Sequence, residues 1–326
     1  MTASMLDPRT QIVTVIGGGG FLGRYVCERL FKAGVRVRVA QRHPRAAWFL
    51  QPLAAVGQLA LVKADVGRPA TLERAIDGAS SVIYLPGLLK GDMERVHVDG
   101  PRAAAEFAAK NGAKSFVHVS AIGASKDSPS RYGQSKARGE AAVKAAFPGA
   151  TIIRPSLVFG PEDQLTNRFA AMAQLPVLPI IAPNTKFQPI YSRDAGPAIA
   201  LAALEPERYA GETIELGGPE IMTMRELVTT VARLSGSERQ VSDLPDMAAD
   251  LLSRFGFLPG APLNRDQWAM LQQDNVASAD GGLAAFGIIP TPLEAVGRQW
   301  LSRFKEGGRF RGLHQPTEAN VTRPAG

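Results

Sequence analysis

The chain has 326 residues, of which 45% are hydrophobic and 21% charged, and its formal net charge at pH 7 is +7. This length and apolar content exclude an intrinsically disordered chain and suit one large α/β domain, or a nucleotide-binding domain with a smaller companion. The positive charge favours acidic partners, among which composition alone leaves anionic lipid, nucleic acid and acidic protein surfaces open.

The cysteine and histidine content and the hydropathy of the chain argue against disulfides, metal sites and membrane spans. Cys27 is the single cysteine, which excludes an internal disulfide, and the four histidines show no metal-ligand spacing, so no metal is expected. No run of about eighteen apolar residues predicts a membrane span. Residues 1–10 contain Asp7 and no apolar core, so we expect no cleaved signal or transit peptide.

The first predicted strand, residues 14–16, leads into a run of glycines and then a helix that ends before Gly34. Three of the glycines recur at three-residue intervals, where a side chain would block the turn, the approach of a pyrophosphate or the packing of helix on strand. The first amides of the helix point at the same turn and can bind an anion. Together these features predict a dinucleotide site, whose phosphate-binding residues are Gly17, Gly20, Phe21, Leu22, Gly23 and Arg24.

The second predicted strand, residues 35–40, ends close to Arg42. In a doubly wound fold this strand end lies beside the adenosine ribose, where an acidic residue would bind the 2′-hydroxyl and an arginine accommodates a 2′-phosphate. Arg42 therefore favours NADP(H) over NAD(H), with a solvated surface arginine as the alternative. The third strand, residues 58–63, leads to Asp65 and Val66, which we expect near the adenine.

Strands and helices continue to alternate through the first half of the chain. A buried fourth strand, residues 81–85, ends at Leu85 and Pro86, which we expect to face the nicotinamide half of the cofactor. A helix is predicted over residues 94–111 and a fifth strand over 114–120. This alternation implies parallel strands joined by right-handed crossovers, hence a Rossmann-type doubly wound α/β sheet covered on both faces.

Three polar residues form a candidate catalytic group. Ser120 ends the fifth strand, and Tyr132 and Lys136 lie four residues apart, on one face of the helix predicted there. The lysine charge would lower the pKa of the tyrosine and make the phenol a proton donor or acceptor. Lys136 could also hold the nicotinamide ribose, and Ser120 a substrate carbonyl. Pro155, which closes the sixth strand, completes the expected cofactor contacts.

In the second half of the chain the regular alternation ends. Asp194 is expected to cap a helix over residues 195–204, and a strand is predicted over 213–216. Thr223 and Glu226 fit a capping box for the next helix.

We divide the chain into a Rossmann domain at residues 10–160, a smaller subdomain at 161–302 that is partly interleaved with its sheet, and a basic extended tail at 303–326. Residues 247–263 begin with a helical apolar face, which is either core packing or a docking surface. The tail is either a solubilising terminus or a contact for anionic headgroups. No motif with interleaved aromatic residues accompanies it, so nucleic acid is discounted.

Several segments carry a resemblance to a known family. The glycine turn, the Tyr132/Lys136 pair and residues 154–160 resemble the extended and atypical short-chain dehydrogenase/reductases. Within that superfamily the chain is most similar to the alpha-subcomplex subunit nine family, the NADPH-binding accessory subunits of respiratory complex I. The segments that carry this second resemblance are 20–26, 130–132, 136–140, 146–148, 169–172, 188–191 and 290–294.

The resemblance implies a bound NADPH that is structural or regulatory, in a subunit that docks near the quinone site where the two arms of complex I meet. It implies other complex I subunits as partners, with anionic lipid headgroups as a further contact, and, in a bacterium, a peripheral place on the cytoplasmic face of the inner membrane.

Turnover is not implied. Only twelve positions separate Ser120 from Tyr132, fewer than in sugar-modifying extended reductases, so we expect little wall around a substrate. On this interpretation Ser120, Tyr132 and Lys136 hold the cofactor. Two alternatives stay open: an NADPH-dependent reductase or epimerase acting on a small carbonyl or sugar-like substrate, and a ligand-sensing regulator that uses the same pocket.

Overall fold

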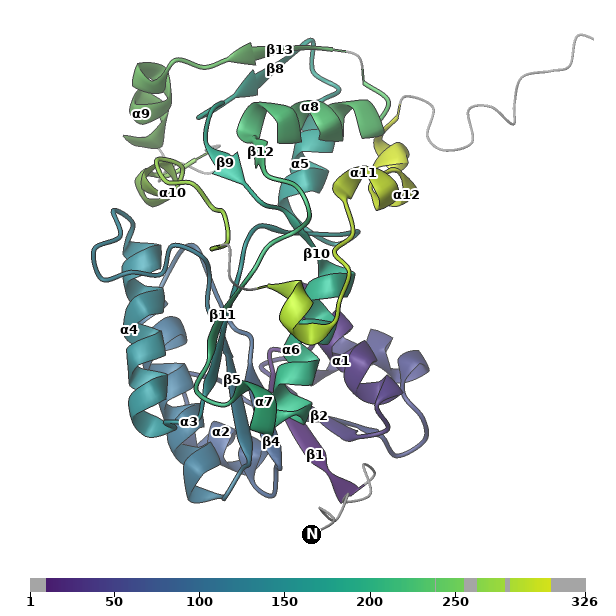
Figure 1. Cartoon of the computed structure of the whole chain (residues 1–326), viewed down its shortest axis with the longest axis vertical. Coiled ribbons are helices and arrows are strands. Elements are labelled where there is room, and N and C mark those ends of the chain that lie inside the picture. The colour runs from purple at the N-terminus through teal and green to yellow at the C-terminus, as the bar shows by residue number, and fades with distance from the viewer. Residues whose placement is uncertain (1–9, 238, 255–262, 279–281, 306–326) are drawn as a thin grey trace, which may run out of the picture.

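The computed structural model describes residues 10–237, 239–254, 263–278 and 282–305. Its centre is a parallel sheet with the strand order β11-β6-β5-β4-β1-β2-β3 (Figure 1). The strands are β1 (Ile12–Ile16), β2 (Arg36–Gln41), β3 (Leu59–Lys63), β4 (Ser81–Tyr84), β5 (Ser115–Val119), β6 (Thr151–Pro155) and β11 (Thr213–Leu216). The order reverses between β1 and β4, and ligands of open α/β sheets bind at the carboxyl ends of the strands beside such a switch point. The predicted Rossmann-type fold is confirmed.

Helices cover both faces of this sheet. One face carries α1 (Phe21–Lys32), the 3-10 segment η2 (Pro44–Leu53) and α6 (Ser192–Leu204), and the other carries α2 (Pro69–Ile76), α3 (Gly100–Lys110) and α4 (Arg131–Ala146). Successive side chains of a strand serve opposite cores: Val117 packs on the α1 face and Phe116 on the α3 face. Gly196 lets α6 approach α1 closely, because a Cβ there would lie 2.5 Å from the Cβ of Tyr25.

The helix predicted over residues 94–111 is interrupted. A π-helical turn, η3 (Arg95–Asp99), precedes α3. Pro101 has no N–H to donate to the carbonyl of His97 four residues earlier, so the regular ladder cannot pass this point. That carbonyl packs on α4 instead, where a Cβ at Gly139 would lie 1.9 Å from the His97 oxygen. Proline in one helix and glycine in the next therefore allow the two helices to make close contact.

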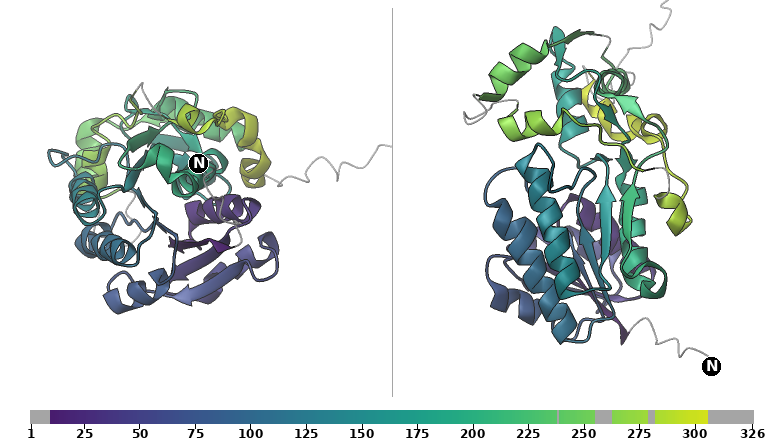
Figure 2. Two further views of the ribbon diagram at one scale, coloured as in Figure 1. Left: turned by 60° about the horizontal axis from the view of Figure 1, so that its bottom comes forward. Right: turned by 60° about the vertical axis from the view of Figure 1, so that its left-hand side comes forward.

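A smaller part of the chain sits over the carboxyl ends of the strands (Figures 1 and 2). It contains three two-stranded pairs, β7 with β10, β8 with β13 and β9 with β12. The strands are β7 (Val158–Phe159), β8 (Val177–Ile180), β9 (Lys186–Phe187), β10 (Ile190–Tyr191), β12 (Met222–Thr223) and β13 (Gln240–Asp243). The helices are α5 (Leu165–Met172), α8 (Met224–Leu234), α9 (Asp246–Arg254), α10 (Arg265–Met270), α11 (Leu293–Val296) and α12 (Arg298–Leu301), with the 3-10 turn η5 (Ser302–Phe304). Helix α7 (Pro206–Tyr209) and the 3-10 turn η4 (Leu283–Phe286) pack instead with α6 in the core of the sheet.

Two predicted helix caps have different outcomes. The capping box of α8 is confirmed: the Thr223 hydroxyl accepts from the Glu226 amide at 3.2 Å, and the Glu226 carboxylate accepts from the Thr223 amide at 2.7 Å. The Asp194 cap is wrong, because α6 already begins at Ser192. The Asp194 carboxylate accepts from the Thr291 amide at 2.7 Å instead, and so ties a distant segment to the helix.

The apolar face predicted at the start of residues 247–263 lies on α9 and is not core. Met247, Leu251 and Leu252 are 85%, 56% and 40% exposed, whereas the small residues Ala249 and Ser253 face inward. Residues 255–262 and most of the predicted tail, residues 306–326, lie outside the described part of the chain. Among the residues that the structure describes, we find no helix with the length and hydropathy needed to cross a bilayer.

Candidate functional site

The glycine turn between β1 and α1 is closely packed. Gly17 has a φ of +79°, which residues other than glycine rarely adopt. A Cβ at this position would also lie 3.3 Å from Pro86. A Cβ at Gly23 would lie 2.6 Å from the carbonyl oxygen of Gly18. Helix α1 starts after Gly20 without a side-chain cap, so its first amides are available to an anion at the turn. The donor set therefore fits the pyrophosphate of a dinucleotide.

Gln41, which sequence reasoning missed, fixes the edge of this turn. Its side-chain oxygen accepts from the Gly19 amide at 2.9 Å, and its nitrogen donates to the carbonyl of His43 at 2.7 Å. The next residue, Arg42, is exposed and makes no hydrogen bond or ion pair with any residue in the described part of the chain. A glutamine at a strand end belongs to no recognisable motif, so nothing in the sequence indicates that its side chain binds the turn.

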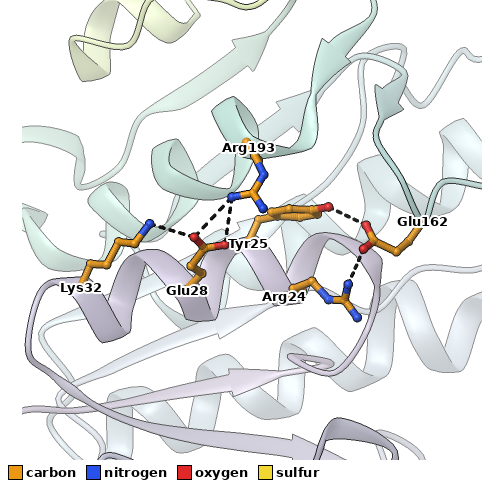
Figure 3. Close-up of polar contacts among 6 residues, drawn as sticks. All are labelled: Arg24, Tyr25, Glu28, Lys32, Glu162 and Arg193. Carbon is orange, nitrogen blue, oxygen red and sulfur yellow. Dashed lines mark hydrogen bonds and ion pairs between the residues drawn. The ribbon is translucent and has the colours of Figure 1, made fainter. Parts of the chain in front are cut away.

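Arg24, a predicted phosphate ligand, is engaged by other protein groups (Figure 3). Its guanidinium pairs with Glu162 and lies 4.2 Å from the centre of the Phe49 ring. The second oxygen of Glu162 accepts from the Tyr25 hydroxyl, and Glu28 of the same helix pairs with Arg193 of α6 at 3.3 Å. These contacts join α1 to the segment after β7 and to α6.

The remaining predicted adenine and nicotinamide contacts lie at the ends of β3 and β4. The Asp65 carboxylate accepts from the amide of Gly67 at 2.9 Å, which shapes the turn after β3. Val66 packs near Gly100, where a Cβ would lie 3.0 Å from the valine Cβ. Leu85 and Pro86 follow β4, and Pro86 contacts the Gly17 position. Because β3 and β4 run parallel to the other strands of the sheet, these residues lie along its carboxyl edge.

Ser120, Tyr132 and Lys136 come together at the ends of β5 and α4. Ser120 directly follows β5, and Tyr132 is the second residue of α4. The Lys136 ammonium donates to the carbonyl of Val119 at 3.1 Å and lies 5.9 Å from the centre of the Tyr132 ring. The Asp266 carboxylate of α10 accepts from the amide of Tyr132 at 3.1 Å, so the second half of the chain holds this helix end.

In the structure the pKa of Tyr132 is raised, whereas the sequence predicts that it is lowered. Burial raises the pKa of Tyr132 to about 12 and lowers that of Lys136 to about 8. Burial disfavours the charged form of each group, and for Tyr132 this effect determines the direction of the shift. The predicted lowering of the tyrosine pKa is therefore wrong for this arrangement.

Two buried histidines lie beside Lys136. In His97, Nε2 accepts from the Leu88 amide at 3.0 Å, so Nδ1 carries the proton and donates to Ser135 at 2.8 Å. Burial lowers the pKa of His97 to about 3, which keeps the ring neutral. His118 is fully buried, and burial lowers its pKa well below the ordinary value. Its ring nitrogens have no hydrogen-bond partner among the described residues, so it packs, next to Tyr84, without hydrogen bonding.

A cavity of about 350 Å³ opens beside Ser120 and Tyr132. The second half of the chain closes it with Phe187, residues 270–271 and residues 273–275. This corrects the expectation of little wall: a distant segment supplies what the short stretch after Ser120 does not. Sequence reasoning missed these residues because they form no recognisable motif and are far from Tyr132 in the chain, Phe187 by 55 positions and residues 270–275 by about 140.

Asn275 anchors that wall. Its side-chain oxygen accepts from the Ser156 hydroxyl at 2.7 Å and from the Leu157 amide at 3.1 Å. The backbone amide of Asn275 donates to the carbonyl of Lys186 at 2.8 Å. Ser120, by contrast, is buried with a hydroxyl that has no partner in the described part of the chain.

The parallel sheet and the glycine turn define a Rossmann-type α/β protein. A sequence profile matches residues 13–217, and the chain belongs to the NAD dependent epimerase/dehydratase family. Over 324 residues the chain is 32% identical to NADH dehydrogenase (ubiquinone) 1 alpha subcomplex subunit 9, mitochondrial, of Rattus norvegicus, with 96% of this chain and 84% of the relative covered. The predicted resemblance to the subunit nine family is thereby confirmed.

A second relative is an enzyme by its name. The chain is 34% identical over 249 residues to the ceramide reductase of Caulobacter vibrioides, which covers 72% of this chain and 74% of the relative. Among solved structures, an NADPH-dependent quinone oxidoreductase from Escherichia coli complexed with NADPH superposes with a TM-score of 0.70 at 21% identity, covering 89% and 99% of the two chains. That structural likeness supports the fold.

Proposed function

We propose that the chain is an NADPH-binding accessory subunit of a complex I-type NADH:quinone oxidoreductase, stabilising the junction between its peripheral and membrane arms without turnover of its own. The observation that carries the proposal is the extent of the similarity to the rat subunit, which covers 96% of the chain and so includes the second half as well as the family's dinucleotide region. Its partners are the neighbouring complex I subunits near the quinone site.

The cofactor part of the proposal rests on the geometry of the turn and of Arg42. The uncapped start of α1 would hold the pyrophosphate, and the exposed guanidinium of Arg42 would hold the 2′-phosphate. The Lys136 ammonium and the Tyr132 hydroxyl would hold the nicotinamide ribose. In this role the high pKa of Tyr132 is no obstacle, because a neutral phenol is a good hydrogen-bond donor.

The surface offers two features that suit a subunit at a membrane junction. The exposed apolar side chains of α9 would dock on a membrane-arm subunit or on lipid, and the net positive charge favours anionic headgroups. In a bacterium, the chain would then be a peripheral protein at the cytoplasmic face of the inner membrane.

The test is to isolate the native protein and ask what accompanies it. We expect copurification with a large membrane NADH dehydrogenase and an NADPH that does not exchange with added nucleotide. A monodisperse protein that exchanges its cofactor rapidly and oxidises it with a small carbonyl compound would contradict the proposal.

A second candidate, an NADPH-dependent reductase, is favoured by the unpartnered Ser120 hydroxyl in the cavity beside Tyr132. NADPH, when bound, would supply a hydride to a carbonyl carbon. Ser120 would orient the carbonyl oxygen, and Tyr132 would deliver the proton that this oxygen gains. Tyr132→Phe separates the two candidates: an accessory subunit keeps normal assembly and respiration, whereas a reductase loses its activity in a pocket that still binds nucleotide.

A further inference from the structure

The cavity beside Ser120 and Tyr132 is lined by both apolar and polar residues. Most of the larger side chains that line it are hydrocarbon or thioether groups from five separate segments of the chain. These apolar residues are Leu89, Ile122, Leu157, Val158, Phe187, Met270 and Leu271. At about 350 Å³ it lies at the small end of the range of ligand sites, roughly 300–1,000 Å³. Its size and walls suit a small ligand with an apolar arm.

The polar groups of the wall are mostly satisfied within the protein. The Ser156 hydroxyl donates to Asn275, and the Ser130 hydroxyl caps α4 by accepting from the Gly133 amide at 3.0 Å. Ser128 lies 3.2 Å from Ser130, oxygen to oxygen. Ser120 is 4% exposed and its hydroxyl has no partner among the described residues. A buried hydroxyl of this kind is costly unless a ligand supplies its hydrogen bond.

The charges around the cavity exclude an anionic ligand from its inner part. Among the described residues that line it there is no lysine, arginine or histidine, and the one ionisable acid, Asp274, accepts from the Lys186 amide at 2.8 Å. Beside Ser120, no cation among the described lining residues would replace the hydration that a pyrophosphate or carboxylate loses. Three basic residues, Lys90, Arg131 and Arg265, line a neighbouring cavity of about 490 Å³ together with Asp266.

We infer that this cavity binds an uncharged carbonyl compound with an apolar arm, its carbonyl oxygen accepting a hydrogen bond from Ser120, and that it rejects sugar nucleotides. The inference rests on the dinucleotide site proposed above, because the carbonyl would lie against the nicotinamide. It holds whether the ligand is turned over or only retained.

The first experiment compares three probes on the full chain loaded with NADP⁺, using isothermal titration calorimetry. Methyl 3-oxooctanoate carries a neutral carbonyl and an apolar arm, 3-oxooctanoate adds a carboxylate next to the same carbonyl, and UDP-glucose carries a pyrophosphate. We expect the ester to bind at least about tenfold more tightly than either anion.

Equal or tighter binding of the acid or of UDP-glucose would overturn the inference, and so would an NADP⁺-loaded chain that binds none of the probes. Failure to bind NADP⁺ would instead contradict the proposed dinucleotide site. In that case the same titration on the chain alone decides between ester and anions, so the two failures are distinguishable.

The second experiment adds a positive charge to the wall. Leu271→Arg should shift the ratio of ester to acid affinity by about tenfold or more towards the acid, since the carboxylate then gains a cation. Ile122→Arg provides a second position if Leu271→Arg does not fold. Ile289→Arg is the matched control, because Ile289 is 89% exposed and does not line the cavity. An unchanged ratio in a folded cavity variant would contradict the inference.

The third experiment tests the hydrogen bond. Ser120→Ala should weaken ester binding, titrated at saturating NADP⁺, by roughly two- to tenfold, the usual range for one neutral hydrogen bond. Full ester affinity in this variant would show that Ser120 does not contact the carbonyl.

Discussion

Tyr132 and Lys136 lie one turn apart on α4, and burial acts on both in opposite directions. It raises the pKa of the phenol to about 12 and lowers that of the ammonium to about 8. The charged form of each group loses hydration that its few neighbours do not replace. Glu140 opposes the change at Lys136, yet it is already shared with the Arg154 guanidinium at 2.7 Å.

The depressed pKa of Lys136 predicts a pH dependence of stability. Between about pH 8 and 10.5 the unfolded chain binds this proton and the folded chain releases it, so the free energy of unfolding should rise with pH across that window. The contribution is roughly 3 kcal/mol at most, from about 1.4 kcal/mol per pKa unit. Denaturant unfolding at pH 7.5, 9 and 10 should show this rise in the wild type and a smaller one in Lys136→Met. Parallel pH profiles would contradict the assignment.

Arg42 carries the predicted preference for NADPH. Its side chain is exposed, and it directly follows Gln41, whose side chain is hydrogen-bonded to the glycine turn. Arg42→Asp should weaken NADPH binding by roughly 10- to 100-fold and NADH binding much less, because one charge-assisted contact to the 2′-phosphate is lost.

Arg36→Asp, at the other end of β2, is the matched control for charge and should leave both affinities nearly unchanged. Titrating both variants with NADPH and with NADH measures the affinities that test this prediction. Equal losses for NADPH and NADH in Arg42→Asp would show that Arg42 is not the 2′-phosphate ligand.

Local sequence was sufficient to predict the glycine turn, because the positive φ of Gly17 belongs to the turn itself and Gly23 is constrained by Gly18, five residues earlier. Gln41 and Asn275 could not be found in the same way. Their side chains act on backbone groups far along the chain, and amide side chains at such positions follow no spacing rule.

At the level of elements, α4 depends on two caps of different origin. Ser130 accepts from the Gly133 amide within the helix's own first turn, whereas Asp266 reaches over from α10 to the amides of Arg131 and Tyr132, at 2.6 and 3.1 Å. A carboxylate at a helix N-terminus also interacts favourably with the helix dipole. Asp266 therefore holds the helix that carries the candidate catalytic group.

Asp266→Ala should lower the free energy of unfolding by about 0.5–2 kcal/mol, the range measured for the loss of an N-terminal cap. Asp127→Ala is the matched control, since Asp127 is exposed in the loop before the same helix. Denaturant unfolding of both variants checks this, and a loss in Asp127→Ala as large as that in Asp266→Ala would contradict a specific cap.

The same contrast between local and distant causes explains which elements were predictable. The Thr223/Glu226 capping box is confirmed because both partners lie within one turn. Asp194 was predicted as a cap from its position before an apolar run, yet its partner is Thr291, about a hundred residues away. The break before α3, inside the helix predicted over residues 94–111, was missed. Pro101 removes a donor there, and the close approach of the His97 carbonyl to Gly139 exists only in the folded chain.

At the scale of the whole molecule, contacts across the two halves hold the smaller part over the sheet. Glu162 engages Arg24 and Tyr25 of α1 (Figure 3). Asp194 holds the Thr291 segment. Exposed ion pairs contribute little individually, about 0–1 kcal/mol each, so the apolar clusters beneath them do most of the stabilising. None of these clusters includes the exposed side chains of α9.

The exposed face of α9 therefore supplies the test of the molecule's place in a larger assembly. Leu251 is 56% exposed, so Leu251→Glu should leave the melting temperature and NADPH affinity nearly unchanged. If α9 docks on a membrane-arm subunit or lipid, the same change buries an unpaired charge at that contact and should reduce copurification with the membrane NADH dehydrogenase several-fold. Ile289→Glu, on a residue that is 89% exposed in another segment, is the matched control. Undiminished copurification of Leu251→Glu would place the docking surface elsewhere on the chain.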